Sequence, residues 1–296
     1  MLETRRQAAV EAARYEIRDR IVVHKLPTND PTFLNFWCPI IPDLPYQRVL
    51  NLEVELRHPF NLLHEKEHGN LLLYSHLEGT LPREIHLEIK YRVERLPLVH
   101  TAEDFEAGDM RSNLIFAKHL SAEQNWAVHP KTKELAGLVA GDRVSVLEKA
   151  RRLYDYVVEN SLGSEDSHAL FVSLCRAVGI PARFAVGEEL DAFGEEETAG
   201  SPHPGVHVWA EFFAPGHGWL PVDTSYACRY QRSLLFGNVP QNHIVWSLGR
   251  DILLQPPQNG GRLLFFVGPY VEVGGRIHPF TFRKISSREI SHSATQ

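Results

Sequence analysis

The stretch that decides the fold begins with GSEDSHALFVSLCRAVGIPAR at residues 163–183. Two extended runs follow it, HVWAE at residues 207–211 and GWLPVD at residues 218–223. The first string predicts a helix over residues 164–178, followed by a short strand over residues 183–187. The two later runs predict neighbouring antiparallel strands. A residue at a helix start, a histidine on one strand and an aspartate after the next are typical of a nucleophile, a base and an orienting acid.

Strand geometry predicts how the histidine and the aspartate meet. Side chains alternate along a strand, so His207, Trp209 and Glu211 share one face. A neighbouring strand that ends at Asp223 brings its carboxylate beside His207, where it would fix the imidazole tautomer and stabilise the imidazolium. At the helix start the sequence has Ser164, whose backbone N–H is the one oxyanion donor that we can name.

Bulk properties exclude several classes of protein. A chain of 296 residues is long enough for one large domain or two modest ones. Its formal net charge of −6 does not favour binding to nucleic acid or to an anionic membrane. No apolar run approaches the roughly 18 residues of a transmembrane helix, and the first residues lack the apolar core of a secretory signal. Three cysteines do not make a disulfide framework. We therefore expect a cytoplasmic protein with no nucleic-acid partner and no membrane partner.

The first hundred residues predict a β-domain, which we expect to be a sandwich. A short helix is expected over residues 3–14. Strands with turn residues between them are expected over residues 15–26, 33–41, 48–56, 70–77 and 84–96. In the last of these, Ile85, Leu87, Ile89, Tyr91 and Val93 alternate with polar residues, which is typical of an antiparallel strand with one solvated face.

After this β-domain the sequence predicts helices and then further strands. We expect domains at residues 1–100, 101–228 and 229–296, the last a β extension packed on the core. Asp142 is predicted to cap a helix that ends at Asn160, and residues 191–205 predict a surface loop. Strands are predicted over residues 262–267 and 270–273, with a turn at Gly274 and a frayed tail after about Ile285.

The strings around the predicted helix and strands resemble the transglutaminase-like superfamily, whose fold is related to that of papain. The resemblance covers residues 120–228 closely, and the preceding β-region is similar to bacterial multi-domain members. It implies an α+β fold, with a helix packed on an antiparallel sheet and an N-terminal β-sandwich-like domain. The resembling strings are LF at 170–171, CRA at 175–177, GIPAR at 179–183, HVWAE at 207–211 and GWLPVD at 218–223.

In that family a cysteine begins the helix, and its position falls on Ser164 in this sequence. The resemblance carries the catalytic histidine to His207 and the aspartate to Asp223. None of the three cysteines can take the place of the nucleophile. Cys175 lies on the buried stripe of the same predicted helix, Cys38 belongs to the β-domain, and Cys228 follows the strand that ends at Asp223.

Three interpretations of Ser164, His207 and Asp223 stay open. The protein is a catalytically impaired relative that binds a peptide, a protein or an amide ligand; or it is an active serine-type amide hydrolase or acyltransferase; or it is a cysteine enzyme inactivated by a Cys-to-Ser substitution at position 164. For an active site, the resemblance implies an acyl-enzyme and no cofactor or metal. The oligomeric state stays open.

Other motifs have simpler explanations. His64-Glu65-Lys66-Glu67-His68 satisfies the H-E-x-x-H pattern of zinc peptidases, but it lies between two β-runs, so a solvated hairpin loop is preferred. Glu195–Glu197 predicts a solvated loop that could gate the site. Asp166 is expected to cap its own helix rather than to act in catalysis. Trp209 and Trp219 are expected to pack the sheet.

Overall fold

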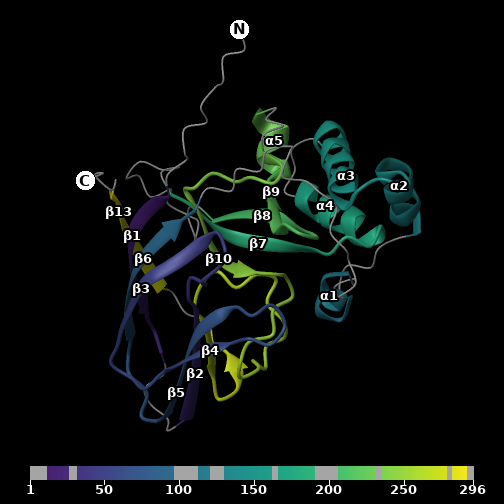
Figure 1. The fold of residues 1–296 in the computed structure, drawn as a ribbon. Helices are drawn as coiled ribbons and strands as arrows, with labels where there is room; N and C mark the ends of the chain where they lie inside the picture. Colours follow the sequence, from purple (N-terminus) through teal and green to yellow (C-terminus); the bar gives the residue numbers. More distant parts are fainter. Residues whose placement is uncertain are drawn as a thin grey trace.

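The computed structural model describes residues 12–26, 32–96, 113–120, 130–161, 166–190, 206–230, 235–278 and 282–291. Over these residues it has the predicted α+β class: antiparallel sheets built largely from the N-terminal strands, and helices packed on a further antiparallel sheet. Figure 1 shows the helices gathered on one side of the molecule and the N-terminal strands on the other. The sheet that contains β7 and β8 lies between them.

Two sheets form the part of the molecule that we call the N-terminal half, although strands from the end of the chain also belong to them. The first has the order β13-β1-β6-β3, with β1 (Ala13–Val23), β3 (Gln47–Leu56), β6 (Ile85–Arg95) and β13 (Phe282–Ser291). The second has the order β12-β11-β2-β5-β4, with β2 (Thr32–Pro39), β4 (Asn61–His64), β5 (Leu71–Gly79), β11 (Tyr270–Val273) and β12 (Arg276–Ile277). Their buried side chains belong to one shared hydrophobic core, which makes the predicted sandwich.

The third sheet supports the candidate site and has the order β10-β7-β8-β9. Its strands are β7 (Ala182–Glu189), β8 (Val206–Ala214), β9 (Gly218–Val222) and β10 (His243–Leu248). The helices are α1 (Asn113–Leu120), α2 (Pro130–Ala140), α3 (Val146–Asn160), α4 (Asp166–Ala177) and α5 (Thr224–Tyr230). All neighbouring strands in this sheet run antiparallel.

Helix α4 is the element on which the others pack. Its apolar stripe, with Phe171, Leu174 and Cys175 fully buried, joins one core with side chains of α2, α3, β7, β8 and β9. The opposite face of the sheet packs Trp209 and Val245 against Tyr46 of the N-terminal half. The third sheet is therefore covered on both faces, which fixes the positions of its strand ends.

Helix α3 begins later than the sequence predicted. Gly141 and Arg143 both have left-handed backbone angles, at φ +71° and +59°, so the chain is not yet helical at Asp142. Ser145 is the N-cap, and its side-chain oxygen accepts a hydrogen bond from the Glu148 backbone N–H at 3.1 Å. The prediction of Asp142 as the cap was wrong, because the loop backbone rather than the side-chain type sets the helix start.

Most predicted strands are present within two or three residues of their expected ends, with three differences. The expected strand at 262–267 is only an isolated bridge between Leu263 and Ile252. The tail is not frayed from Ile285, because β13 continues to Ser291 and pairs with β1. Strand β4 and helix α5 were not predicted. The expected helix at 3–14 and the loop at 191–205 lie largely or wholly outside the described residues.

The residues after position 228 are shared among the sheets. Strand β10 completes the third sheet, β11 and β12 extend one sheet of the sandwich, and β13 extends the other. The turn predicted at Gly274 joins β11 to β12. The domain boundaries at residues 100 and 228 stay predictions.

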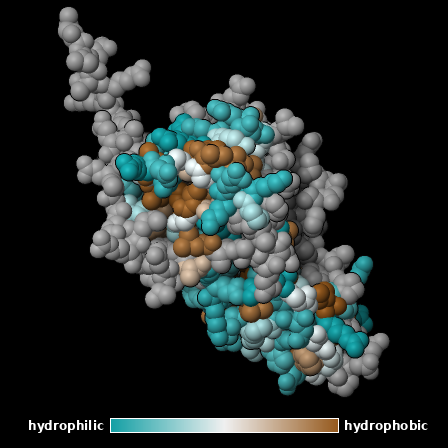
Figure 2. Space-filling model, turned by 90° about the vertical axis from the view of Figure 1, so that its right-hand side faces the viewer, coloured by the Kyte–Doolittle hydropathy of each residue, from teal (hydrophilic) through white to brown (hydrophobic). Residues whose placement is uncertain are grey.

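The surface and the helices add one observation each. Figure 2 shows apolar side chains gathered in the upper part of the molecule, on the helical side, whereas the lower part is mostly hydrophilic. Among the helices described, none combines the length and the apolar character needed to cross a membrane.

Candidate active site

Strand register brings His207 and Asp223 together. Ala210 on β8 lies opposite Val222 on β9, so Trp209 faces the position of Asp223, and His207 is two residues farther along the same face. This diagonal lies within reach of an imidazole and a carboxylate. The observed distance between His207 Nε2 and Asp223 Oδ2 is 2.6 Å. The predicted approach of these two side chains is thus present, although their catalytic role stays a prediction.

The Asp223 carboxylate is fully buried and has several donors. Oδ2 accepts from His207, while Oδ1 accepts from the Ser225 hydroxyl at 3.1 Å and from the Tyr226 backbone N–H at 3.0 Å. The last bond makes Asp223 the N-cap of α5, three residues before its donor. Burial alone would raise the pKa of Asp223, but the hydrogen bond from His207 and the nearby histidine charges outweigh it and lower the pKa. Asp223 is therefore a carboxylate at neutral pH.

The hydrogen bond to Asp223 sets the tautomer of His207. When Nε2 carries the proton that is donated to the carboxylate, the neutral ring has its lone pair on Nδ1. Nδ1 is then the nitrogen that can take a proton from a nucleophile. The ring is 15% exposed and is stacked on Tyr226, with centroids 4.4 Å apart. The Tyr226 hydroxyl donates in turn to Glu189, so the surface under His207 is itself held in place.

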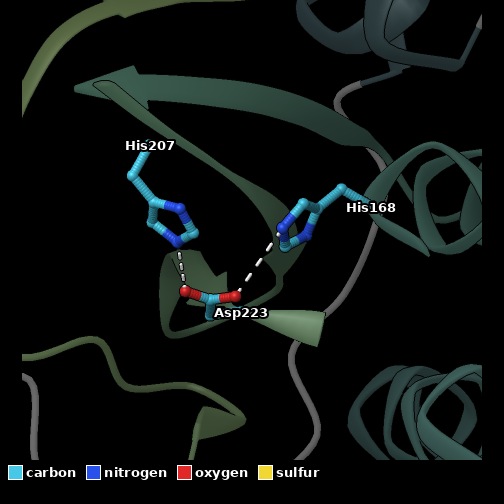
Figure 3. Close-up of side chains that lie close together, drawn as sticks. All are labelled: His168, His207 and Asp223. Atoms are coloured by element: carbon cyan, nitrogen blue, oxygen red, sulfur yellow. Dashed lines mark hydrogen bonds and ion pairs between the residues drawn. The ribbon is translucent and has the colours of Figure 1, made fainter. Parts of the chain in front are cut away.

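His168 is a further member of the site. It lies in the first turn of α4, fully buried, with Nδ1 2.8 Å from the Thr224 hydroxyl and Nε2 3.6 Å from Asp223 Oδ1. Figure 3 shows its ring and that of His207 on two sides of the Asp223 carboxylate. Burial lowers the pKa of His168 to about 4, against an opposing effect of Asp223, so this ring is neutral at pH 7.

No role was assigned to His168 from the sequence. The one available signal was its spacing, three residues before Phe171 on the buried face of α4. His243 was missed as well: it is buried, its ring lies edge-on to His207 at 5.5 Å, and burial followed by the charge of His207 lowers its pKa to about 3. Neither residue belongs to a motif that the sequence displays.

Ser164 lies outside the described residues, as do Glu165 and Glu195–Glu197. The distance from the predicted nucleophile to His207 is therefore not part of the geometry above. The side chain of Asp166, at the start of α4, is likewise outside the description, so its predicted capping role stays a prediction.

The cysteines occupy the places expected for inert thiols. Cys175 is fully buried on α4, and burial raises the pKa of its thiol far above its usual value. Cys38 is buried in the sandwich core. Cys228 is half-buried on α5, and its thiol contacts the Val158 carbonyl oxygen at 3.7 Å. Each of these thiols is thereby held by packing.

The H-E-x-x-H pentapeptide is not a helix. His64 ends β4, and residues 66–68 form the turn that leads to β5. The Glu65 carboxylate accepts hydrogen bonds from the backbone N–H groups of Glu67, His68 and Asn70, so it closes this turn. A zinc peptidase needs both imidazoles on one helix face with a free glutamate. The predicted hairpin loop is present, and the zinc-peptidase geometry is not.

The two tryptophans pack as predicted. Trp209 is fully buried between the third sheet and the N-terminal half. Trp219 lies under the Arg183 guanidinium, whose carbon is 3.9 Å from the ring centroid. Arg183 in turn contacts the buried Glu211 carboxylate at 2.7 Å.

Comparison with known proteins agrees with this architecture. The family model described as the transglutaminase-like superfamily matches residues 163–224. An uncharacterized protein of Haemophilus influenzae is 24% identical over 81% of this chain and 81% of its own length. The crystal structure of a "putative cysteine protease" from Cytophaga hutchinsonii has a TM-score of 0.55 at 14% identity, and the match covers 97% of this chain and 93% of that one. The periplasmic domain of TgpA from Pseudomonas aeruginosa has a TM-score of 0.35 at 17% identity, covering 77% of this chain and 91% of that chain.

At 14% identity, the likeness to the Cytophaga hutchinsonii protein shows the fold alone. The family match is more specific, because its residues include the start of α4, the strand of His207 and the carboxylate of Asp223. Residues 163–224 are therefore similar to the transglutaminase-like superfamily, and the α+β fold of the chain is like that of the Cytophaga hutchinsonii protein.

Proposed function

We propose that the site around His207 and Asp223 binds a peptide, a protein segment or another amide ligand, and that Ser164 makes it poor at acyl transfer. The observation that carries the proposal is the 2.6 Å pairing of His207 with a buried carboxylate. Such a pair is the part of an acyl-transfer site that orients a base. A hydroxyl at position 164 leaves that base without a thiol to deprotonate.

Acidity explains why the serine impairs the chemistry. A cysteine with a pKa of about 8.5 becomes a standing thiolate when a helix N-terminus and an imidazolium lower that value. An aliphatic hydroxyl is a far weaker acid and stays protonated in the same field. It must lose its proton during the attack, which requires a closer alignment of base and oxyanion donors than an ion pair does. A site shaped for a thiolate does not supply that alignment by itself.

One observation favours the serine-type hydrolase as a second candidate. His207 donates from Nε2 to an ionised aspartate, and its Nδ1 lone pair is the free one. This is the state of a general base that is ready to accept a proton. A cysteine enzyme with a Cys-to-Ser substitution at 164 would have the same pair, and the variant below also tests that alternative.

The experiment restores the thiol. Ser164→Cys is treated near pH 7 with a thiol-directed electrophile, and modification of residue 164 is followed by mass spectrometry. We expect labelling at least about 10-fold faster than that of Cys228, because His207 converts the new thiol into a thiolate. Adding His207→Ala should abolish the acceleration. The unaltered chain measures the background of the three native cysteines.

Two results would contradict the proposal. Labelling of Ser164→Cys at the background rate, or equally fast labelling without His207, would mean that the pair does not act on position 164. Stoichiometric reaction of the unaltered chain with a fluorophosphonate at Ser164 would replace impaired acyl transfer by serine catalysis. Ligand binding is tested with a library of short peptides: saturable binding that Trp and Tyr fluorescence detects should weaken in His207→Ala.

A further inference from the structure

Three side chains with metal-ligating atoms converge in the site. His168 comes from α4, His207 from β8, and Asp223 from the junction of β9 and α5. One ligand atom of each lies within 4.8 Å of the other two. Figure 3 shows both imidazoles directed at the carboxylate from different elements. Two histidines and one carboxylate from separate elements are a donor set that suits Zn²⁺ and other divalent transition ions.

His168 supplies an observation that the acyl-transfer site does not explain. Its Nε2 is buried and has no hydrogen-bond partner among the residues described. The nearest polar atom is Asp223 Oδ1 at 3.6 Å, which is beyond hydrogen-bonding distance. A buried polar atom without a partner is costly, and it is often explained by an ion or a water that completes the site.

The other nitrogen of His168 is held as a metal ligand requires. Nδ1 lies 2.8 Å from the Thr224 hydroxyl, which is itself 2.9 Å from the Ser167 hydroxyl. When Thr224 donates to Ser167, it accepts from His168 Nδ1–H, and the lone pair is then on Nε2. Such outer hydrogen bonds fix the tautomer and the direction of a metal-ligating histidine. The Nε2 lone pair then faces the Asp223 carboxylate, an arrangement that a cation between them stabilises.

The distances from the two histidines to the Asp223 carboxylate, one to each oxygen, are near those around a bound ion. Bonds of about 2.0–2.1 Å in a tetrahedral zinc site place neighbouring ligand atoms about 3.3 Å apart. His168 Nε2 and Asp223 Oδ1 are already 3.6 Å apart. His207 Nε2 is 2.6 Å from Asp223 Oδ2, so the His207 ring must withdraw by roughly 0.7 Å to admit an ion between them. Its side chain is 15% exposed, so it is the least buried of the three ligands, and the movement would be a slide within the plane that Tyr226 supports.

We propose that His168, His207 and Asp223 form a three-ligand site for a divalent transition-metal ion of the Zn²⁺ type. Binding takes the place of the proton that His207 Nε2 donates to Asp223: Nε2 loses this proton, Nδ1 takes one up from the solvent, and the metal-bound imidazole stays neutral. The pair therefore serves either as an oriented base or as part of a metal site, and not as both at once. This assignment goes beyond the proposed amide binding and does not depend on Ser164.

The test uses the full chain, freed of metal with a chelator and then dialysed. Titration calorimetry with Zn²⁺ should give one ion per chain, and Co²⁺ should give the visible absorption bands of a low-coordinate nitrogen-bound ion. Mg²⁺ in excess should not compete, because it prefers oxygen ligands. We expect His168→Gln and His207→Ala each to weaken Zn²⁺ binding at least 10-fold. Thr224→Val should weaken it by about 10-fold through the orientation of His168.

His64→Ala is the matched control, because it removes an exposed histidine from the H-E-x-x-H loop and should leave the affinity unchanged. Circular dichroism establishes that each variant is folded. If His168→Gln does not fold, the Co²⁺ bands of the unaltered chain and their loss in His207→Ala carry the test.

Absence of saturable Zn²⁺ binding by the unaltered chain would overturn the proposal, as would stoichiometric binding that survives in both His168→Gln and His207→Ala. Either outcome leaves the thiol-labelling test of the proposed function untouched, because that assay follows modification of residue 164 and requires no metal ion.

Discussion

The proposed function gives the two ring nitrogens of His207 different roles. Nε2 is committed to Asp223 at 2.6 Å, and stacking on Tyr226 fixes the plane of the ring. The position of Nδ1 follows from the same two constraints. The carboxylate thus acts through charge as well as through position, since it would stabilise the imidazolium that forms when Nδ1 takes a proton.

Two variants of Asp223 separate charge from position. In the Ser164→Cys background, Asp223→Asn keeps an oxygen that can accept from His207 Nε2, whereas Asp223→Ala removes both the acceptor and the charge. We expect the rate of thiol labelling to fall about 10-fold or more for alanine and by a smaller factor for asparagine. Labelling rates near pH 7 measure both. Equal rates in all three proteins would mean that the carboxylate does not orient the base.

The same variants should differ in stability, which gives an internal control. Asp223 caps α5 by accepting from the Tyr226 N–H, and loss of an N-cap acceptor costs about 1 kcal/mol. Asparagine is also a good N-cap, so the free energy of unfolding should fall more for alanine than for asparagine. Urea unfolding measures this difference independently of labelling.

At the scale of one strand, Gly187 on β7 permits a close approach of its neighbours. A side-chain carbon at this position would lie 1.9 Å from the Ile244 carbonyl oxygen of β10 and 2.9 Å from the Trp209 ring. Backbone atoms of a paired strand cannot move aside cheaply. Gly187 therefore sets the spacing between β7 and β10, on which the positions of Trp209 and His207 depend.

Gly187→Ala should destabilise the protein by about 2 kcal/mol or more, because overpacking forces the backbone apart. Gly137→Ala is the matched control: it lies within α2, where no neighbouring atom is within 4 Å. There alanine should stabilise by about 0.5–1 kcal/mol through its higher helix propensity. Urea unfolding measures both changes. A Gly187→Ala protein as stable as the unaltered chain would contradict the steric argument.

Elements differ in how well the sequence predicts them, and the reason is physical. Strand β6 alternates clearly, so its position follows from period two alone. Helix α3 was expected from Asp142 because an acidic residue is a good cap, but Arg143 adopts a left-handed conformation that no propensity reveals. Helix α5 has seven residues and begins at the site itself, capped by Asp223. Its sequence is too short to show a helical period.

The residues of the site also differ in how well the sequence predicts them. The approach of His207 to Asp223 is predictable because strand alternation places the two side chains together, whereas Ser164 lies outside the described residues and its place in the site stays a prediction. His168 reaches the site through packing of α4 on β8, and His243 through the pairing of β10 with β7, which involves long-range contacts. Neither histidine has a local pattern, so the donor set proposed for a metal ion becomes visible only in three dimensions.

At the scale of the whole molecule, the two halves are joined by polar groups that complete β10. The Gln47 side-chain amide bonds both the N–H and the carbonyl oxygen of Val245, at 2.8 and 3.0 Å. The Asn70 amide does the same for Leu248, at 2.6 and 2.8 Å. Both amides come from the sandwich, so they satisfy the backbone groups on the open edge of β10.

Buried histidines occur in several parts of the molecule, and they make its stability depend on pH. His68, His119, His168 and His243 all have lowered pKa values, near 4, 2, 4 and 3, and desolvation is the largest cause in each case. Near the ordinary pKa of about 6.5, the unfolded chain gains protons at these rings while the folded chain does not. Folding therefore excludes protons that the unfolded state binds.

The free energy of unfolding should consequently fall as the pH decreases from about 6.5 toward 4, because stability rises with pH wherever the unfolded state binds more protons. For His168 alone the loss is on the order of 3 kcal/mol, from 2.5 pH units at about 1.4 kcal/mol each. Urea unfolding at pH 7, 5.5 and 4.5, with chelator present, measures the slope. In His168→Gln the slope should be smaller by about 1.4 kcal/mol per pH unit. Equal slopes in the two proteins would mean that His168 binds a proton as readily in the folded state as in the unfolded state, which would contradict the neutral ring that the metal site requires.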